Sequence, residues 1–478
     1  MKSVPTLDPP GAGMLFIGLT LLLLGGCATF SRDGGFNSVE SVARERLNKD
    51  VKWVKSDDDA NSVRATVQQL LAKPLSADDV VQIALLNNRG LQATFAELGI
   101  AEADLVQAGR MTNPHFAYLR TRNDEGRKIE WALTFPIIDL LTIPLRTKIL
   151  ARHFEEAKLG VAGQVVGVAI ETRRAYYRTV AAGETVRYVE QVKTTAEAGA
   201  ELAQRMARAG NINKLTHMRE QVFYAEVVAR LAGAKQMAIA ERERLTRLMG
   251  LYGENVGFKL PERLPDFPAE LPELKDLEVT AMAQRFDVQA AKRETESLAE
   301  SLGLTKATRF INVLEAGPAQ TKEEPGGWKR GFEISLQLPI FDWGGARVAK
   351  AEAIYMQSVH RVAEIAINAR SEVRETYSAY RTTYETAKHY RQEIVPLRKQ
   401  ISEENTLRYN GMLISVFELL ADAREQVASV NASIDALRDY WLAEADLQAA
   451  LNGTQAGRPG AGPKAGGGVI PNPALAGH

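Results

Sequence analysis

The sequence is poor in cysteine, in aromatic residues and in net charge. Its 478 residues include one Cys and six His, the aromatic content is 7%, and 59 Lys and Arg residues balance 59 Asp and Glu residues. A single cysteine excludes a disulfide framework and a cysteine-rich metal site. The balanced charge excludes a strongly basic surface for nucleic acid, and the low aromatic content favours helices over a β-sandwich.

Long apolar runs and catalytic motifs are also missing. No stretch of about 18 apolar residues follows the extreme N-terminus, which excludes a helical membrane protein. The histidines are scattered, and neither a phosphate-binding glycine loop nor an HExxH motif occurs. We therefore expect no enzymatic activity, no metal site, no cofactor and no nucleic-acid partner.

The N-terminus has the features of a bacterial lipoprotein signal. The apolar run from Met14 to Leu24 has the length of a signal-peptide core and is too short to span a bilayer. It ends in Leu24-Gly25-Gly26-Cys27, which resembles a lipobox. We interpret residues 1–26 as a lipoprotein signal peptide and Cys27 as the lipidated first residue of the mature chain. Ala28, in place of an Asp, implies sorting to the outer membrane; the alternative is a chance cysteine behind an ordinary signal peptide.

The rest of the chain is one unit used twice, with an offset near 200 residues. Matching positions include Glu171, Arg173 and Tyr176 with Glu372, Arg374 and Tyr377, and Phe135-Pro136-Ile137-Ile138-Asp139 with Leu338-Pro339-Ile340-Phe341-Asp342. The predicted segments are an N-terminal segment 27–74, repeat 1 at 75–250, a proline-rich linker at 251–273, repeat 2 at 274–453 and a disordered Gly/Pro-rich tail at 454–478.

Each repeat predicts the same elements, in a fold that is mainly α with a small β part. A helix (77–109 and 274–307) is followed by a β-hairpin (113–136 and 308–339), a very long helix (145–209 and 346–410) and another helix (214–249 and 415–452). The first strands are expected at 113–122 and 310–316, with Pro318 in the second hairpin's loop. A helix of about 65 residues is roughly 98 Å long, so we expect a rod, with Pro396 kinking the second long helix.

Helix packing is indicated by a narrow stripe in the last helix. Its apolar residues are spaced three and four apart: Val427, Val430, Ile434, Leu437 and Trp441. This is the spacing of a coiled-coil seam rather than of a broad globular face. The alternative is an ordinary solvent-exposed coiled coil, which has the same spacing of apolar residues.

The second strand of each hairpin alternates apolar and polar residues, which gives it one apolar face. The apolar positions that we expect to face lipid are Ile129, Trp131 and Leu133 in the first hairpin and Phe332, Ile334 and Leu336 in the second. Four strands cannot close a barrel, whereas three chains supply twelve. The competing interpretation is a small soluble sheet packed on the helices.

These features together resemble the TolC-type outer membrane factor family over residues 75–453. The most specific motifs are Asn113-Pro114, Leu338-Pro339-Ile340-Phe341-Asp342-Trp343-Gly344-Gly345, and Arg408-Tyr409-Asn410-Gly411 followed by Glu418-Leu419-Leu420. The resemblance implies strand-to-helix junctions at Pro136, Pro339, Gly344 and Gly345. It also implies a homotrimer with a twelve-stranded outer-membrane β-barrel, a twelve-helix periplasmic α-barrel and an equatorial collar formed by the termini and the linker.

The resemblance further implies a passive exit duct of a tripartite efflux or type I secretion system, with a periplasmic adaptor and an inner-membrane pump as partners. Glu418 and Asp422 match the acidic positions that narrow the periplasmic aperture, and six such carboxylates in a trimer favour cations. An ordinary solvated helix face is the alternative. Gly210, Leu215, Gly411 and Leu419 are expected to form the adaptor-docking tip. A periplasmic coiled-coil structural lipoprotein without a pore is the other class of function.

Overall fold

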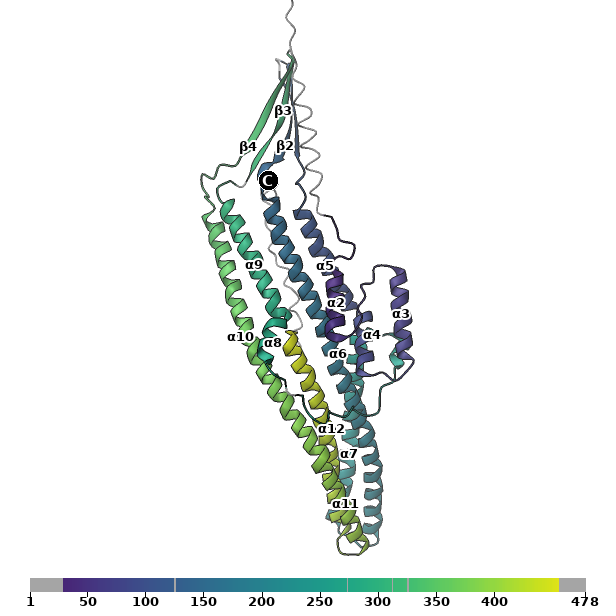
Figure 1. The fold of residues 1–478 in the computed structure, drawn as a ribbon. Helices are drawn as coiled ribbons and strands as arrows, with labels where there is room; N and C mark the ends of the chain where they lie inside the picture. Colours follow the sequence, from purple (N-terminus) through teal and green to yellow (C-terminus); the bar gives the residue numbers. More distant parts are fainter. Residues whose placement is uncertain (1–28, 124–125, 273, 312, 325, 455–478) are drawn as a thin grey trace, which may run out of the picture.

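The computed structural model describes residues 29–454 apart from 124–125, 273, 312 and 325. The predicted signal peptide, Cys27 and nearly all of the predicted tail therefore lie outside the described residues. Within the described part the chain is an elongated helical rod with one small sheet at one end and two helix-to-helix loops at the other (Figure 1). This confirms the prediction of a mainly α fold with a small β part.

The described residues of the first half of the chain form four short helices, two strands and two long helices. The elements are α2 (Phe36–Leu47), α3 (Asp57–Leu71), α4 (Ala77–Asn87), α5 (Arg89–Ala108), β1 (His115–Asn123), β2 (Gly126–Pro136), α6 (Ile137–Arg208) and α7 (Lys214–Met249). The 72 residues of α6 correspond to about 108 Å. One helix therefore runs nearly the whole length of the rod.

The second half has a similar order but an interrupted long helix. A short 3₁₀ turn, η2, precedes the first helix of this half. The elements are η2 (Gly253–Gly257), α8 (Leu277–Gln284), α9 (Phe286–Ala307), β3 (Leu314–Glu324), β4 (Trp328–Leu336), α10 (Gly345–His389), the π-helical turn η3 (Tyr390–Ile394), α11 (Val395–Asn410) and α12 (Val416–Asn452). In Figure 1, α10 and α11 follow one edge of the rod from the sheet to the opposite end.

The helices expected at 77–109 and 274–307 are each broken once. Asn88 and Arg285 adopt extended backbone, so each ends one helix and begins the next. The Asn88 side-chain amide donates a hydrogen bond to the Leu248 backbone carbonyl at 2.8 Å, and the Arg285 guanidinium donates one to the Ala450 backbone carbonyl at 2.8 Å. The same arrangement thus occurs twice, 197 residues apart, with each break held against the C-terminal turn of a long helix.

Helix α6 begins earlier than the expected residue 145. It starts at Ile137, directly after Pro136 closes β2, and Pro144 lies inside it. Asp139 in the first turn accepts a hydrogen bond from Thr112 at 2.7 Å and lies 3.4 Å from Arg146. These contacts stabilise the first turns, because an acid near a helix N-terminus complements the helix dipole. Pro144 has no backbone N–H, so one helical hydrogen bond is missing near the start of α6.

The predicted interruption near Pro396 is present in the second long helix. The π-helical turn η3 immediately precedes α11, and Pro396 lies in the first turn of α11. Proline has no backbone N–H to donate to the residue four positions earlier, so the regular α-helical ladder cannot pass through this point. The local change to a wider turn is one of the ordinary ways in which a helix accommodates that loss.

The sheet is antiparallel in the order β1-β2-β3-β4, which leaves β1 and β4 as open edges. The prediction for β3 is wrong: the strand begins at Leu314 rather than 310 and runs to Glu324, so it includes Pro318, which is expected in the hairpin loop. The β2–β3 pairing is interrupted opposite Gly317 and Pro318, so Pro318 does not need the N–H that it lacks. A Cβ on Gly317 would lie 1.8 Å from the Leu133 carbonyl oxygen, so glycine is required for the close approach of the strands.

The core is a series of apolar clusters along the rod rather than one centre. In the largest, which includes residues of α6 and α7, Ile434 of the predicted stripe is buried, and the partly buried Val430, Leu437 and Trp441 pack against the cluster. Trp441 stacks on Tyr177 with ring centroids 5.0 Å apart. The stripe therefore faces the neighbouring long helices as a partly buried packing seam.

The linker at residues 251–273 is held along the middle of the rod. The Trp441 indole donates to the Pro265 carbonyl at 2.9 Å, and the Tyr384 hydroxyl donates to the Ala269 carbonyl at 2.6 Å. Leu264 of the linker is itself buried. These contacts tie the linker to both α10 and α12 at the level of η3.

Candidate functional site

The end of the rod opposite the sheet consists of two loops. Gly210 in the α6–α7 loop has a positive φ of 74°. In the α11–α12 loop Gly411 has a φ of −80°, and Met412 takes the left-handed position instead, with a φ of 57°. Met412 and Leu413 are 93% and 77% exposed, and Leu215 at the start of α7 is also exposed. Met412 and Leu413 were not singled out from the sequence, although two large apolar residues after a turn glycine are an available signal.

Both loops end in a helix cap, and the second cap uses a predicted aperture residue. The Asn213 side chain accepts from the Thr216 backbone N–H at 2.9 Å. Ser415 caps α12, and the Ser415 backbone N–H donates to the Glu418 carboxylate at 3.2 Å. This reciprocal arrangement is a capping box. Glu418 is exposed at the very end of the rod, and its carboxylate also stabilises the start of α12.

Asp422 lies one turn further along α12 and has a different environment. Its side chain is only 9% exposed, and its Oδ2 atom has no hydrogen-bond partner among the described residues. Two residues on, Arg424 donates to the buried carboxylate of Glu220 at 2.8 Å and lies 4.4 Å from the centre of the Phe223 ring. These contacts join α12 to α7 close to the tip.

The two predicted aperture carboxylates therefore differ within one chain. Glu418 is accessible, whereas Asp422 is largely enclosed by its own chain. Leu419, expected at the docking tip, is half-buried. A ring of six carboxylates requires three chains, so the aperture and the docking tip remain predictions.

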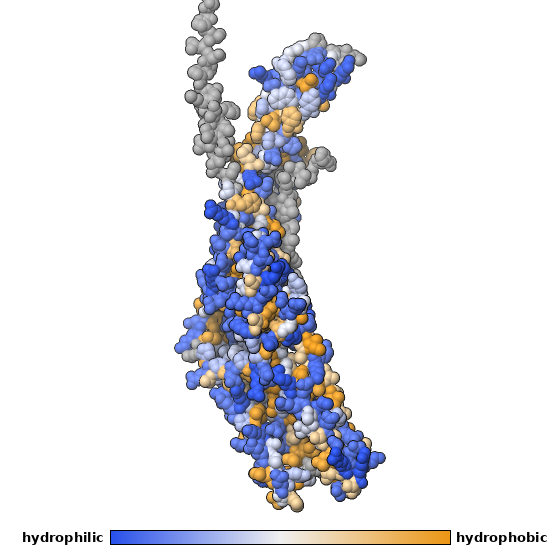
Figure 2. All heavy atoms as spheres, turned by 90° about the vertical axis from the view of Figure 1, so that its right-hand side faces the viewer, coloured by the Kyte–Doolittle hydropathy of each residue, from blue (hydrophilic) through white to orange (hydrophobic). Residues whose placement is uncertain are grey.

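At the other end, the sheet has one apolar face. The strand register places the six residues expected to face lipid on the same face: Ile129, Trp131, Leu133, Phe332, Ile334 and Leu336. Within β2, Trp131 and Leu133 are partly exposed, whereas Ala132 and Thr134, which alternate with them on the opposite face, are 6% exposed. Figure 2 shows hydrophobic atoms in a band below the hydrophilic free end of the sheet. The large apolar side chains thus point away from the protomer.

The two strand-to-helix junctions are built differently. Pro136 joins β2 directly to α6, whereas residues 337–344, which include Pro339, connect β4 to α10. Gly344 has a φ of 74° and caps α10, and a Cβ there would lie 2.6 Å from the Arg309 carbonyl oxygen. Gly345 is the first residue of α10, and a Cβ there meets no atom within 4 Å. Only Gly344 has a backbone conformation that requires glycine.

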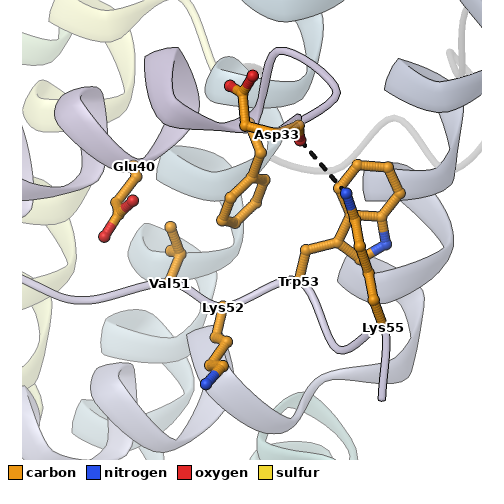
Figure 3. Close-up of a pocket in the computed structure, with 7 residues that line it drawn as sticks. Asp33, Glu40, Val51, Lys52, Trp53 and Lys55 are labelled. Atoms are coloured by element: carbon orange, nitrogen blue, oxygen red, sulfur yellow. Dashed lines mark hydrogen bonds between the residues drawn. The ribbon is translucent and has the colours of Figure 1, made fainter. Parts of the chain in front are cut away.

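The N-terminal segment is attached to the outside of the rod. The Ser31 backbone N–H and hydroxyl both donate to the buried Glu102 carboxylate of α5, at 2.6 and 2.5 Å. Beside this contact is an open pocket of about 350 Å³, which contains Asp33, Phe36 and Trp53 (Figure 3). The Lys55 ammonium lies over the Trp53 ring, 3.7 Å from the ring centre, and donates a hydrogen bond to the Asp33 backbone carbonyl at 3.3 Å. The residues that line the pocket thus include those that attach this segment to the rod.

Arg285 is a buried cation that links helices in the second half of the chain. Arg285 donates to the Asp287 carboxylate at 2.7 Å and lies 2.8 Å from the Glu372 carboxylate. Burial lowers the pKa of the Arg285 guanidinium, but the hydrogen bonds and charges of Asp287 and Glu372 outweigh burial and hold the pKa above its usual value. Glu372 is one of the residues that identified the repeat, and its contact joins α10 to the break between α8 and α9.

None of the helices that the structure describes is sufficiently long and apolar to cross a membrane.

Comparison with known proteins gives matches among solved structures. No protein-family model matches the chain, and no curated protein matches it. The outer membrane channel CmeC of Campylobacter jejuni has a TM-score of 0.68 and 15% identity, covering 94% of each chain. The open-state MtrE outer membrane channel of Neisseria gonorrhoeae has a TM-score of 0.62 and 17% identity, covering 82% of this chain and 91% of its own.

A third solved structure agrees with these two. CusC, described in terms of transmembrane channel formation, has a TM-score of 0.64 and 16% identity, covering 81% of this chain and 92% of its own. The fold is therefore that of outer membrane channel protomers. The resemblance to TolC-like outer membrane factors, indicated by the sequence motifs, is confirmed at the level of the fold.

Proposed function

We propose that three copies of this chain form an outer-membrane channel-tunnel. It serves as the passive exit duct of a tripartite efflux or type I secretion system. The observation that carries the proposal is the sheet at the end of the rod, with two open edges and one exposed apolar face. An open edge is not tolerated in lipid, and closure with neighbouring copies removes it.

The helical part supports the same proposal through its dimensions. A rod with an α6 of about 108 Å provides far more reach than a small sheet needs for support. Three such protomers would enclose a long tunnel between the sheet and the loops at 209–213 and 411–415. We assign these loops and the first turns of α7 and α12 to docking of a periplasmic adaptor, with Gly210, Leu215, Gly411 and Leu419 in the contact. The adaptor would connect the duct to an inner-membrane pump, which supplies the energy.

Lipidation at Cys27 is proposed as a second membrane attachment. The Ser31–Glu102 contact holds the chain four residues after Cys27 against α5, whose C-terminal end leads into the sheet (Figure 1). Four extended residues span at most about 14 Å. An acylated Cys27 would therefore be attached to the same half of the rod as the sheet.

The deciding experiment is extraction of the full-length protein from bacterial membranes. We expect heat-modifiable trimers in the outer-membrane fraction that resist carbonate washing and form pores in planar bilayers. The Cys27→Ala variant should keep all three properties, because the barrel itself anchors the trimer. A monomer released by carbonate, without pore activity, would instead support a coiled-coil structural lipoprotein.

A further inference from the structure

The apolar face of the sheet changes character with distance from the helices. Near the helices Phe116, Leu133, Pro318 and Phe332 form one row across the four strands. Towards the free end the register places five cations on this same face: Arg120, Arg122, Arg127, Lys322 and Arg330. We call these five residues the basic rim. Figure 2 shows hydrophilic atoms at the free end of the sheet and hydrophobic atoms nearer the helices.

The basic rim has an excess of positive charge that the opposite face lacks. Among the described residues of this face the rim's five cations meet one acid, Glu324, which lies 2.9 Å from Lys322 and 3.8 Å from Arg127. The described residues of the opposite face carry two lysines and four glutamates: Lys128, Lys329, Glu130, Glu315, Glu323 and Glu333. The positive excess is therefore specific to the apolar face.

Three cations of the rim are available for a partner. Arg120, Arg122 and Arg330 are exposed, and no acid among the described residues lies within ion-pair distance of them. Arginine presents a planar fork of donors that matches the oxygens of a phosphate group. Arginines that have no ion pair among the described residues and lie next to an apolar surface thus fit a ligand that combines acyl chains with phosphate.

The height of the rim matches the boundary of a membrane. Ile334 and Trp328 on β4 are six residues apart, which is about 20 Å along a strand. Exposed Leu338 and Phe341 extend the apolar surface beyond the sheet towards the helices. An outer-membrane barrel has an apolar band about 25 Å tall with aromatic residues at its borders. Trp328, 6.0 Å from the Lys322 ammonium, lies in the row where the cations begin to dominate.

We propose that the basic rim binds the phosphate groups of anionic lipid in the outer leaflet of the membrane that the sheet spans. This inference rests on the proposed function, because it requires the apolar face to be in contact with lipid. The arginines would bind the phosphates, while the apolar rows below them contact the acyl chains. The binding fixes the height and the tilt of the barrel in its membrane.

The test measures how much lipid A full-length trimers retain when the lipid carries its phosphate groups and when these groups have been removed. Trimers are reconstituted in phosphatidylethanolamine vesicles that contain bisphosphorylated lipid A or enzymatically dephosphorylated lipid A. They are then extracted, and native mass spectrometry counts the lipid A that each trimer retains. Wild type should retain the bisphosphorylated form preferentially, and increasing salt should reduce the retention, because screening weakens charge contacts.

The variant Arg120→Gln/Arg122→Gln/Arg330→Gln should bind the bisphosphorylated lipid about fivefold more weakly for each cation removed. Lys128→Gln/Lys329→Gln is the matched control, since these lysines occupy the opposite face at the same height. The control should retain lipid A like wild type. Equal loss in the control, or no loss in the arginine variant, would overturn the proposal.

Wild type alone also decides the question if the arginine variant does not assemble. Pore-forming wild-type trimers that retain both forms of lipid A equally would overturn the rim proposal and leave the proposed function intact. If wild type forms neither trimers nor pores, the proposed function fails and this inference fails with it.

Discussion

Single residues carry much of the local geometry at the junctions between strands and helices. Gly317 and Gly344 both lie where a side chain would collide with a backbone carbonyl, of Leu133 and Arg309 respectively. The sequence singles out Gly344 by its motif, but not Gly317, since the requirement at Gly317 comes from a strand that is distant in sequence. A sequence motif can therefore identify a glycine at a local turn, but not a glycine that is required because another strand lies close to it.

The adjacent pair Gly344 and Gly345 provides a direct test. Gly344→Ala should destabilise the protein by about 1–3 kcal/mol, because alanine at a positive φ is strained and its Cβ would collide with the Arg309 carbonyl. Gly345→Ala should be neutral or slightly stabilising, since it adds a good helix former where there is space. Thermal unfolding of both variants measures the difference, and equal losses of stability would contradict the assigned geometry.

His153 gives a pH-dependent contribution on α6. The hydrogen bond with Glu156 raises the pKa of His153, burial lowers it by a smaller amount, and the charges of Glu156, Glu294 and Asp104 raise it further above the usual 6.5. Because the folded pKa exceeds the unfolded one, the stabilisation is fully present below pH 6.5 and is lost as pH rises through the folded pKa. The half-exposed pair contributes about 0.2–1 kcal/mol.

His153→Gln should therefore lower the melting temperature at pH 5.5, about one unit below the usual histidine pKa, and should have little effect at alkaline pH. Calorimetry across this range measures the difference from wild type. His360→Gln, at an exposed histidine of α10, is the control for the substitution itself. A His153 effect that is independent of pH would indicate packing rather than charge.

At the scale of the elements, sequence periodicity identifies most helices and strands. Helix α7 has the expected bounds, Lys214–Met249, and α12 begins one residue after the expected Ser415, which is its cap. The errors lie at Asn88, Arg285, the start of α6 and the extent of β3. At each of these points a distant partner supplies the deciding contact: the C-terminal turns of α7 and α12, Thr112, or strand β2. Local propensity cannot contain such contacts.

The tip of α12 allows the aperture prediction to be tested. Glu418→Ala with Asp422→Ala should raise single-channel conductance in planar bilayers, because the shorter side chains widen the constriction. It should also weaken block by multivalent cations, because charge that attracts cations there is removed. Glu425→Ala, one turn further along and paired with Arg398 at 3.0 Å, is the control and should keep wild-type conductance. If the double variant also keeps it, both carboxylates are surface residues.

The single variants distinguish the two positions. Glu418→Ala also removes the Glu418 half of the capping box with Ser415, so it should cost about 0.3–1 kcal/mol of helix stability in addition to any effect on conductance. Asp422→Ala should not affect the cap. A conductance change confined to Glu418→Ala would assign the aperture to the exposed carboxylate alone.

At the scale of the whole molecule, the open edges of the sheet are the feature that most requires neighbouring copies. β1 and β4 lie at opposite edges of one protomer, three strand spacings apart, which is about 14 Å. Cysteines on these two strands therefore cannot form a disulfide within one flat sheet, because a disulfide requires Cα atoms less than about 7 Å apart. Only closure with the next copy brings such edges together.

Cysteine crosslinking should trap that closure. In a Cys27→Ala background, Phe116→Cys is combined in turn with a cysteine at Arg330, Phe332 or Ile334, and at least one pair should give a covalent trimer on non-reducing gels. Phe116→Cys with Leu133→Cys is the control: these residues pair within one protomer and should yield only intramolecular links. Exclusively monomeric products from all three edge pairs would contradict a closed trimeric barrel.

The sequence alone determines the mainly helical class, the packing seam on α12 and the apolar face of the strands, because these follow from periodicity and reach only a few residues. It also contains the motifs of the lipobox and of the strand-to-helix junction. The tertiary structure decides where the helices break, how β3 passes β2 at Gly317, and that Glu418 is exposed while Asp422 is enclosed. It also brings cations from all four strands onto one face of the sheet. Each of these depends on contacts between segments far apart in the chain, which no local pattern specifies.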